Sequence, residues 1–169
     1  GEDGRTFLGV DPAAAAVTLT ALGAAAVGLN CSVGPRELLP ALEAMAGATS
    51  LPLVIQPNAG LPRLVDGETV FDAGPGEFAR YARAFLDAGA AMLGGCCGTT
   101  PEHIRALRRV LDGRSPSGKR RGGPARCRLC GWQGVLELEE RSIAAVGERI
   151  NPTGRPKMRD ALYAGEWDY

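Results

Sequence analysis

The sequence predicts an α/β protein built around a parallel sheet. Three short, continuously apolar runs alternate with segments whose apolar residues recur at helical spacing. Strands of this kind are typical of sheets buried on both faces, and parallel strands are joined by crossover helices. A doubly wound nucleotide-binding sheet and a (β/α)8 barrel both satisfy the pattern. Because no G-x-G-x-x-G follows a predicted strand, the nucleotide-binding alternative is disfavoured.

The first half of the chain supplies two strands and two helices. Residues 12–24 are alanine-rich and start at Asp11 and Pro12, a capping residue and a first-turn proline. Residues 25–31 form the first apolar run. Residues 36–47 carry leucines at helical spacing and stop at a glycine, with Pro40 expected in the first turn. The run 51–58 is the second strand.

The next three elements repeat this order. Residues 75–89 place Phe78 and Phe85 on one helical face, and residues 90–95 form the third apolar run. The helix predicted over 99–113 has threonines at its cap, Pro101 at its start and a glycine at its end.

The chain divides into three parts. Residues 1–113 contain the strands and helices just described. Residues 114–142 are rich in Ser, Gly, Pro and basic side chains, which predicts an exposed linker. Residues 143–169 start a new unit, with a strand, a glycine-containing loop and a helix near 155–165. The first residues read like the interior of a longer protein, so we expect a fragment.

Composition excludes several classes. Lys plus Arg and Asp plus Glu number 19 each, so bulk charge predicts no nucleic-acid partner. No run of about 20 apolar residues predicts a membrane span. The five cysteines are an odd number, which argues against a disulfide framework and favours a cytoplasmic protein with reduced thiols.

Cysteines and an asparagine fall where the predicted strands end. Cys31 closes the first run, Asn58 the second, and Cys96 and Cys97 the third. The carboxyl ends of parallel strands open on one side of the sheet, so these side chains should converge. Three thiolates suit Zn²⁺, and three protein ligands with one open position are typical of catalytic zinc.

The sequence "GGCCG" around the adjacent pair supports this interpretation. Neighbouring strand residues point to opposite faces, so Cys96 and Cys97 can share an ion only if the strand breaks. Gly94, Gly95 and Gly98 make such a break easy. The positive end of the following helix favours thiolates. Two alternatives remain open, namely a vicinal redox dithiol and plain buried cysteines.

Four motifs carry a resemblance. "GLNCSVGP", "PNAGLP" and "GGCCGTTPEHI" resemble the homocysteine-binding barrel of the cobalamin-dependent methionine synthase family, and "GERINPTGRPK" is similar to the start of its methyltetrahydrofolate-binding barrel. The resemblance implies that residues 1–113 are the C-terminal part of a homocysteine-binding (β/α)8 barrel and that residues 143–169 begin a pterin-binding domain. A full barrel takes about 250 residues.

The resemblance also implies the site and its chemistry. Cys31, Cys96 and Cys97 would bind zinc, with Asn58 as an oxygen ligand when substrate is away, and Glu148 and Asn151 would contact the pterin. The zinc-bound homocysteine thiolate would attack a methyl group delivered by methylcobalamin from methyltetrahydrofolate, giving methionine. Cobalamin would sit on a further domain, so we expect little turnover from this chain alone.

One alternative family remains, and the histidine and the two remaining cysteines are interpreted separately. A betaine-homocysteine-type methyltransferase uses a similar three-thiolate site without the "GERINPTG" segment. The single histidine, His103, is expected at the surface or in a capping role. Cys127 and Cys130 form a C-x-x-C without two further ligands nearby, and we interpret them as incidental thiols.

Overall fold

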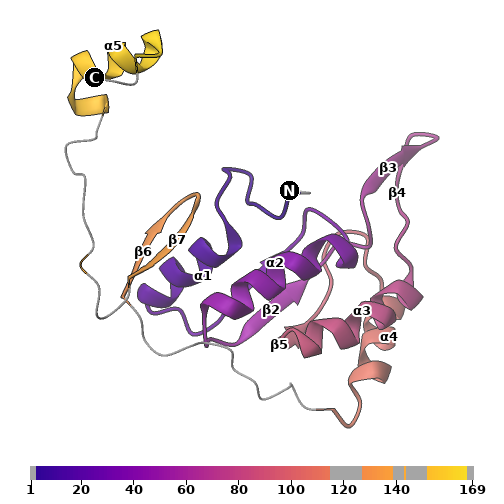
Figure 1. Cartoon of the computed structure of the whole chain (residues 1–169). Coiled ribbons are helices and arrows are strands. Elements are labelled where there is room, and N and C mark those ends of the chain that lie inside the picture. Colours follow the sequence, from indigo (N-terminus) through magenta and orange to yellow (C-terminus); the bar gives the residue numbers. More distant parts are fainter. Residues whose placement is uncertain (1–2, 115–126, 139–142, 144–151, 167–169) are drawn as a thin grey trace. The chain divides into compact units, whose positions relative to one another are not determined.

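A computed structural model describes residues 3–114, 127–138, 143 and 152–166 (Figure 1). The chain forms two compact units, Gly1–Leu138 and Glu139–Tyr169. The first unit is a mixed α/β structure, as the sequence predicts, and it carries every element discussed below except the last two. Within the described ranges, no helix is long and apolar enough to cross a membrane.

The central sheet of the first unit has three parallel strands. They are β1 (Val27–Asn30), β2 (Leu53–Gln56) and β5 (Ala90–Leu93), in the order β1-β2-β5. Val27 pairs with Leu53 and Asn30 with Gln56, and the pairing of β2 with β5 shifts register after Leu53. All three strands therefore end at the same edge. The sheet fits the predicted parallel α/β class, while the eight-stranded barrel stays a prediction.

Four helices accompany this sheet, and each starts with a proline, which fits the first helical turn because it lacks an N–H. They are α1 (Pro12–Ala21), α2 (Pro35–Ala48), α3 (Pro75–Asp87) and α4 (Pro101–Leu111). The Asp11 carboxylate caps α1 by accepting from the N–H groups of Ala13 and Ala14. Pro40 lies in the second turn of α2, since the helix begins at Pro35, so its expected first-turn position was wrong.

Two buried clusters hold the helices in place. Leu42, Met45, Ile55 and Phe85 belong to the larger cluster, where α2 and α3 pack with the strands. Burying each such side chain stabilises the fold by about 1.5–3 kcal/mol. Phe78, Ala82 and Leu107 form part of a second cluster between α3 and α4. This second cluster anchors α4, the helix that follows the loop with the adjacent cysteines.

Two β-hairpins were not predicted. The strands β3 (Pro62–Val65) and β4 (Glu68–Phe71) pair antiparallel around Asp66 and Gly67, whose φ angles are 51° and 84°. Positive φ at both central residues is typical of a type I′ turn, for which Asp-Gly is a favoured sequence. Figure 1 shows this hairpin extending away from the helices of the first unit.

The second hairpin falls in the predicted linker, residues 114–142. It consists of β6 (Cys127–Gly131) and β7 (Gly134–Leu138), and it belongs to the first unit. The Arg128 guanidinium donates to the Ala48 carbonyl at the end of α2, at 2.7 Å, and its Nε lies 3.0 Å from a Glu137 carboxylate oxygen. Residues 127–138, which lie within the segment expected to be an exposed linker, therefore form a hairpin that the sequence did not predict.

The second unit contains two described elements. A 3₁₀ turn, η1, spans Pro152–Gly154, and helix α5 spans Pro156–Ala164. The helix ends at Gly165, whose φ of 74° is the left-handed conformation common after helices. Helix α5 agrees with the helix predicted near 155–165. The strand predicted before it falls mainly on residues outside the described ranges.

Candidate metal centre

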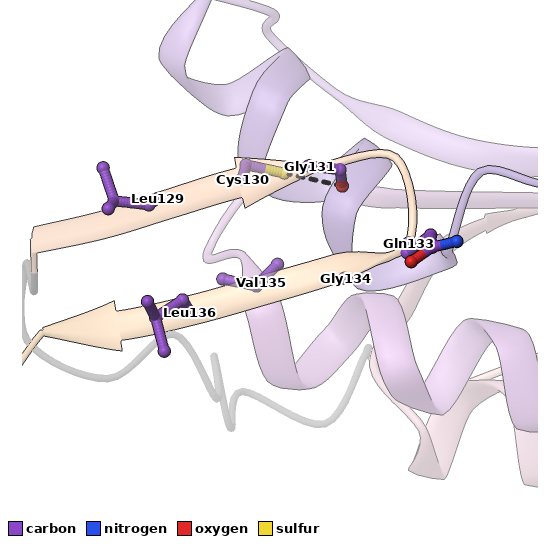
Figure 2. A pocket seen from close by; sticks show the side chains of 7 residues that line it. All are labelled: Leu129, Cys130, Gly131, Gln133, Gly134, Val135 and Leu136. Atoms are coloured by element: carbon purple, nitrogen blue, oxygen red, sulfur yellow. Dashed lines mark hydrogen bonds between the residues drawn. The ribbon is translucent and has the colours of Figure 1, made fainter. Parts of the chain in front are cut away.

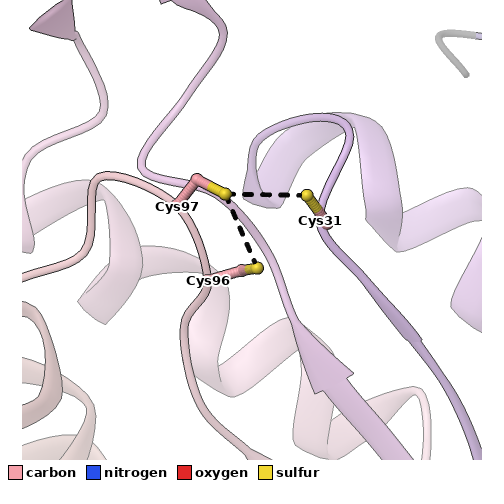
Figure 3. Close-up of side chains that lie close together, drawn as sticks. All are labelled: Cys31, Cys96 and Cys97. Carbon is pink, nitrogen blue, oxygen red and sulfur yellow. Dashed lines mark hydrogen bonds between the residues drawn. The ribbon is translucent and has the colours of Figure 1, made fainter. Parts of the chain in front are cut away.

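Three cysteine sulfurs meet at the carboxyl edge of the parallel sheet. Cys31 follows β1, and Cys96 and Cys97 follow β5 after two glycines. The Sγ atoms of Cys31 and Cys97 lie 3.7 Å apart, and those of Cys96 and Cys97 lie 3.9 Å apart (Figure 3). All three sulfurs are within 4.8 Å of one another. The structure thus brings together the thiols that the sequence separates by 66 residues.

These separations fit a zinc ion. A tetrahedral ion with Zn–S bonds of about 2.3 Å sets its sulfur ligands about 3.8 Å from each other. The separations from Cys97 to Cys31 and from Cys97 to Cys96 lie on either side of that value. A disulfide would need about 2.05 Å, and all three cysteines are free. Two of the three separations between the sulfurs therefore match the edges of a zinc tetrahedron, and the third pair, Cys31 and Cys96, lies within 4.8 Å.

A left-handed turn lifts Cys31 out of its strand. The φ angles of Cys31 and Ser32 are 64° and 69°, which are uncommon for residues with a side chain. The Cys31 N–H still donates to Gln56 on the neighbouring strand, and the Val33 N–H closes the turn on the Cys31 carbonyl at 2.9 Å. Strain of this kind clusters at functional sites.

The loop with the adjacent cysteines is tied to the strand beside it. The Cys96 N–H donates to the Pro57 carbonyl at 2.8 Å, and the Cys96 carbonyl accepts from both the N–H and the hydroxyl of Thr99. Of the three predicted glycines, only Gly98 has a positive φ, 74°. Gly95 has no room for a side chain, since an added Cβ would lie 2.8 Å from the Thr99 Cβ.

Asn58 supports the same loop from the neighbouring segment. It is 4% exposed, and its Oδ1 accepts from the Cys97 N–H at 3.2 Å, while its own N–H donates to the Val33 carbonyl. Asn58 thus connects the segment after β1 to the loop after β5. Its role as a zinc ligand stays a prediction.

Hydrogen bonds among the thiols make them unequal. The backbone N–H of Ser32, followed by the thiols of Cys97 and Cys96, lowers the pKa of Cys31. Hydrogen bonds to Cys31 and then Cys96 raise the pKa of Cys97. In the metal-free cluster, negative charge is therefore favoured on Cys31 rather than on Cys97.

His103 has a capping role, as predicted, but it is not at the surface. It is 6% exposed, and its Nδ1 accepts from the N–H of Thr100, the residue that caps α4. Its Nε2 lies 2.9 Å from the Ala73 carbonyl oxygen. Sequence reasoning missed this second contact, and also the packing of Phe71 against Gly98. Neither has a local sequence signal, because each joins segments far apart in the chain.

The other predicted residues lie apart from the thiol cluster. Cys127 and Cys130 are three positions apart on β6, so they point to opposite faces and sit about 10 Å apart along the strand. Cys130 donates to the Ala14 carbonyl and borders a hollow formed by its own hairpin (Figure 2). Neither shares an ion with the other in this arrangement, which agrees with incidental thiols. Glu148 and Asn151 lie outside the described residues.

Taken together, the fold and the cluster define a parallel α/β protein with a candidate three-thiolate metal site at its strand ends. The model of the family "Homocysteine S-methyltransferase" matches residues 1–111. The chain therefore belongs to the homocysteine S-methyltransferase family.

Two curated relatives extend this match. The chain is 32% identical over 169 residues to the methionine synthase of Mycobacterium leprae (strain TN), and 31% identical over 166 residues to that of Mycobacterium tuberculosis (strain ATCC 25618 / H37Rv). Each alignment covers 97% of this chain but 14% of the relative. The chain thus spans about one seventh of the length of these proteins.

Solved structures of the homocysteine methyltransferase MmuM from Escherichia coli are also similar. The apo form has a TM-score of 0.45 and 31% identity, covering 58% of this chain and 32% of that one. The metallated form has a TM-score of 0.45 and 32% identity, covering 57% and 28%.

Proposed function

We propose that this chain carries the zinc-binding, thiol-activating part of a homocysteine S-methyltransferase of the methionine synthase type. The observation that carries the proposal is the clustering of the Cys31, Cys96 and Cys97 sulfurs within 4.8 Å, with the two separations from Cys97 matching the edges of a zinc–thiolate tetrahedron. When bound there, zinc would accept the homocysteine thiol as a fourth ligand and hold it as a thiolate, which attacks a methyl group.

The surrounding residues suit this role. Cys97 is exposed, so the side of the cluster that it borders is open to an incoming thiol. Helix α4 begins four residues after Cys97 and directs the positive end of its dipole to this part of the rim, where negative charge would gather. Asn58 and the strained turn at Cys31 fix the two ligand segments against one another. The site is thereby preorganised for three thiolates.

The methyl donor is part of the same proposal. Methylcobalamin, held by a cobalamin-binding domain and recharged from methyltetrahydrofolate, would supply the methyl group. The alignment with methionine synthases runs through residues beyond 111, including the "GERINPTG" segment, which supports this type over a betaine-homocysteine methyltransferase. Glu148 and Asn151 would contact the pterin.

The zinc content of single-cysteine variants tests the proposal. We expect the purified wild-type chain to bind one zinc ion, and Cys31→Ser to lose most of it, because two thiolates hold zinc far less well than three. Cys127→Ser is the matched control, since Cys127 is also a free cysteine but lies on β6. Equal zinc content in the two variants would contradict the proposal and favour a vicinal dithiol.

Substrate binding is tested separately with Co²⁺ in place of zinc. Addition of L-homocysteine should strengthen the thiolate-to-metal absorption in the near ultraviolet, because a further sulfur joins the metal. L-homoserine, which has a hydroxyl in place of the thiol, is the control ligand and should leave the spectrum unchanged. The same response to both compounds would argue against direct binding of the thiol.

A further inference from the structure

The geometry points to His103 as a positioning residue that holds the Cys96–Cys97 loop in its metal-binding arrangement. It does so by linking the start of α4, which follows that loop, to Ala73 in the connection between β4 and α3. This inference rests on the proposed zinc site and deepens it by assigning a role to the only histidine in the chain.

The hydrogen bonds of the ring define its tautomer. A backbone N–H can only donate, so the Thr100 N–H at 3.1 Å requires a lone pair on Nδ1. The ring proton then sits on Nε2, which donates to the Ala73 carbonyl oxygen at 2.9 Å. The neutral imidazole therefore serves as an acceptor toward the helix cap and as a donor toward Ala73.

From Ala73 the contacts lead back to the thiols. The Ala73 N–H donates to the Ala59 carbonyl at 2.8 Å, and the Ala59 N–H donates to the Cys97 carbonyl at 2.9 Å. The chain from Cys97 through Gly98 and Thr99 to the α4 cap closes a ring of bonds around the loop. Because the ring is closed, Cys97 is held from both sides.

The members of this ring are shielded from water. Ala59, Ala73 and His103 are 1%, 4% and 6% exposed. The Phe78 and His103 side chains make an edge-to-face contact, and the centroids of their aromatic rings lie 4.9 Å apart. Water cannot easily replace a donor lost at His103, so the Ala73 carbonyl would be left buried and unpaired. The loop would have to move to restore its partner.

Three substitutions distinguish the two hydrogen bonds of the His103 imidazole, one to Thr100 and one to Ala73. His103→Gln keeps an N–H donor at the distance of Nε2 from the backbone, because its amide nitrogen is the same number of bonds away. His103→Asn places its amide oxygen where Nδ1 lies, so it keeps the cap and loses the donor to Ala73. His103→Ala loses both. Thr49→Val is the control, since Thr49 is 5% exposed and hydrogen-bonded but lies beyond the other end of the sheet strands.

Zinc affinity, measured by competition with a chromophoric chelator, is the first readout. We expect His103→Asn and His103→Ala to bind zinc about 10-fold more weakly than wild type, the lower end of what loss of a direct contact to a metal ligand costs, because His103 acts on Cys97 through Ala73 and Ala59. His103→Gln should stay within about 3-fold of wild type and Thr49→Val should match it. Equal affinity for the Asn and Gln variants, or an equal loss in Thr49→Val, would overturn the inference.

Amide hydrogen exchange in the metal-free chain is the second readout, followed by NMR. The N–H groups of Ala59, Ala73 and Cys97 should exchange at least about 10-fold faster in His103→Asn than in His103→Gln or Thr49→Val. Uniform exchange across the variants would overturn the inference. If the wild-type chain binds no zinc, the proposed function fails, while this second readout still decides whether His103 holds the loop.

Discussion

Gly98→Ala should damage both the fold and the cysteine loop. The φ of Gly98 is 74°, and a residue with a side chain in this conformation loses about 1–2 kcal/mol. A Cβ there would also overlap the Phe71 ring and lie 2.8 Å from the Phe71 Cβ, so rotation of the ring cannot remove the clash. Overpacking adds about 1–3 kcal/mol. The expected loss is about 2–5 kcal/mol in a domain stable by about 5–15 kcal/mol.

Gly113→Ala is the matched control for the backbone term. Gly113 has a φ of 69°, and no atom lies within 4 Å of the position that an added Cβ would take, so only the conformational loss of about 1–2 kcal/mol applies. Urea unfolding followed by circular dichroism measures both variants. With an m-value of about 1–3 kcal/mol/M, the midpoint of Gly98→Ala should fall below that of Gly113→Ala by about 1 M.

A double-mutant cycle isolates the clash. Phe71→Ala removes the two ring atoms nearest the new methyl group and leaves only the contact with its own Cβ at 2.8 Å. It should therefore be less harmful in the Gly98→Ala background than alone, with a coupling of about 1–3 kcal/mol. Zinc affinity should fall in Gly98→Ala, because Gly98 directly follows Cys97, and recover in part in the double variant. Equal stability of Gly98→Ala and Gly113→Ala, or additivity in the cycle, would refute the reasoning.

Two further predictions concern the support of the thiols. Asn58→Ala should lose about 1–3 kcal/mol of stability and weaken zinc binding, because the Cys97 N–H loses its acceptor. The control is Asn30→Ala, since Asn30 is an exposed residue at the end of β1. Equal effects of the two substitutions in urea and zinc titrations would exclude the contact between Asn58 and Cys97 as the cause. Ser32→Gly should raise the unfolding midpoint through relief of about 1 kcal/mol of strain at φ 69°, with zinc affinity kept; a lower midpoint would show that the left-handed turn is not strained.

The sequence was most informative where one local pattern determines the type and position of a helix or strand. The strands β1, β2 and β5 lie within the three predicted apolar runs, because parallel strands are typically apolar along their length. The expected burial of both faces is incomplete in the structure, since Met92 of β5 is 58% exposed. The starts of α3 and α4 follow from prolines that fit the first helical turn. The convergence of the cysteines followed from topology, since all parallel strands end at one edge.

The sequence was least informative for exposed strands and for contacts between residues far apart in the chain. The strands β3 and β4 are largely exposed, so they lack an apolar run, although the Asp66-Gly67 turn signal was present. The hairpin at 127–138 lies beside basic and glycine-rich residues that masked it. The contact of His103 with Ala73 spans 30 residues, and no spacing rule predicts such a pair.

The supports of the thiols bear on how the proposed zinc binding and the proposed methyl transfer would divide between this chain and other parts of the enzyme. Cys31 and the adjacent pair flank β2 on both sides, and four of their hydrogen-bond partners belong to β2 or follow it directly, namely Gln56, Pro57, Asn58 and Ala59. The three thiols are therefore held by neighbouring strands of a single small sheet. Methyl transfer has wider needs, since a donor carrying the methyl group must reach the bound thiolate in line. The contacts of the three thiols would organise the proposed metal site from this chain's own residues, and the chain spans 14% of the methionine synthases it matches.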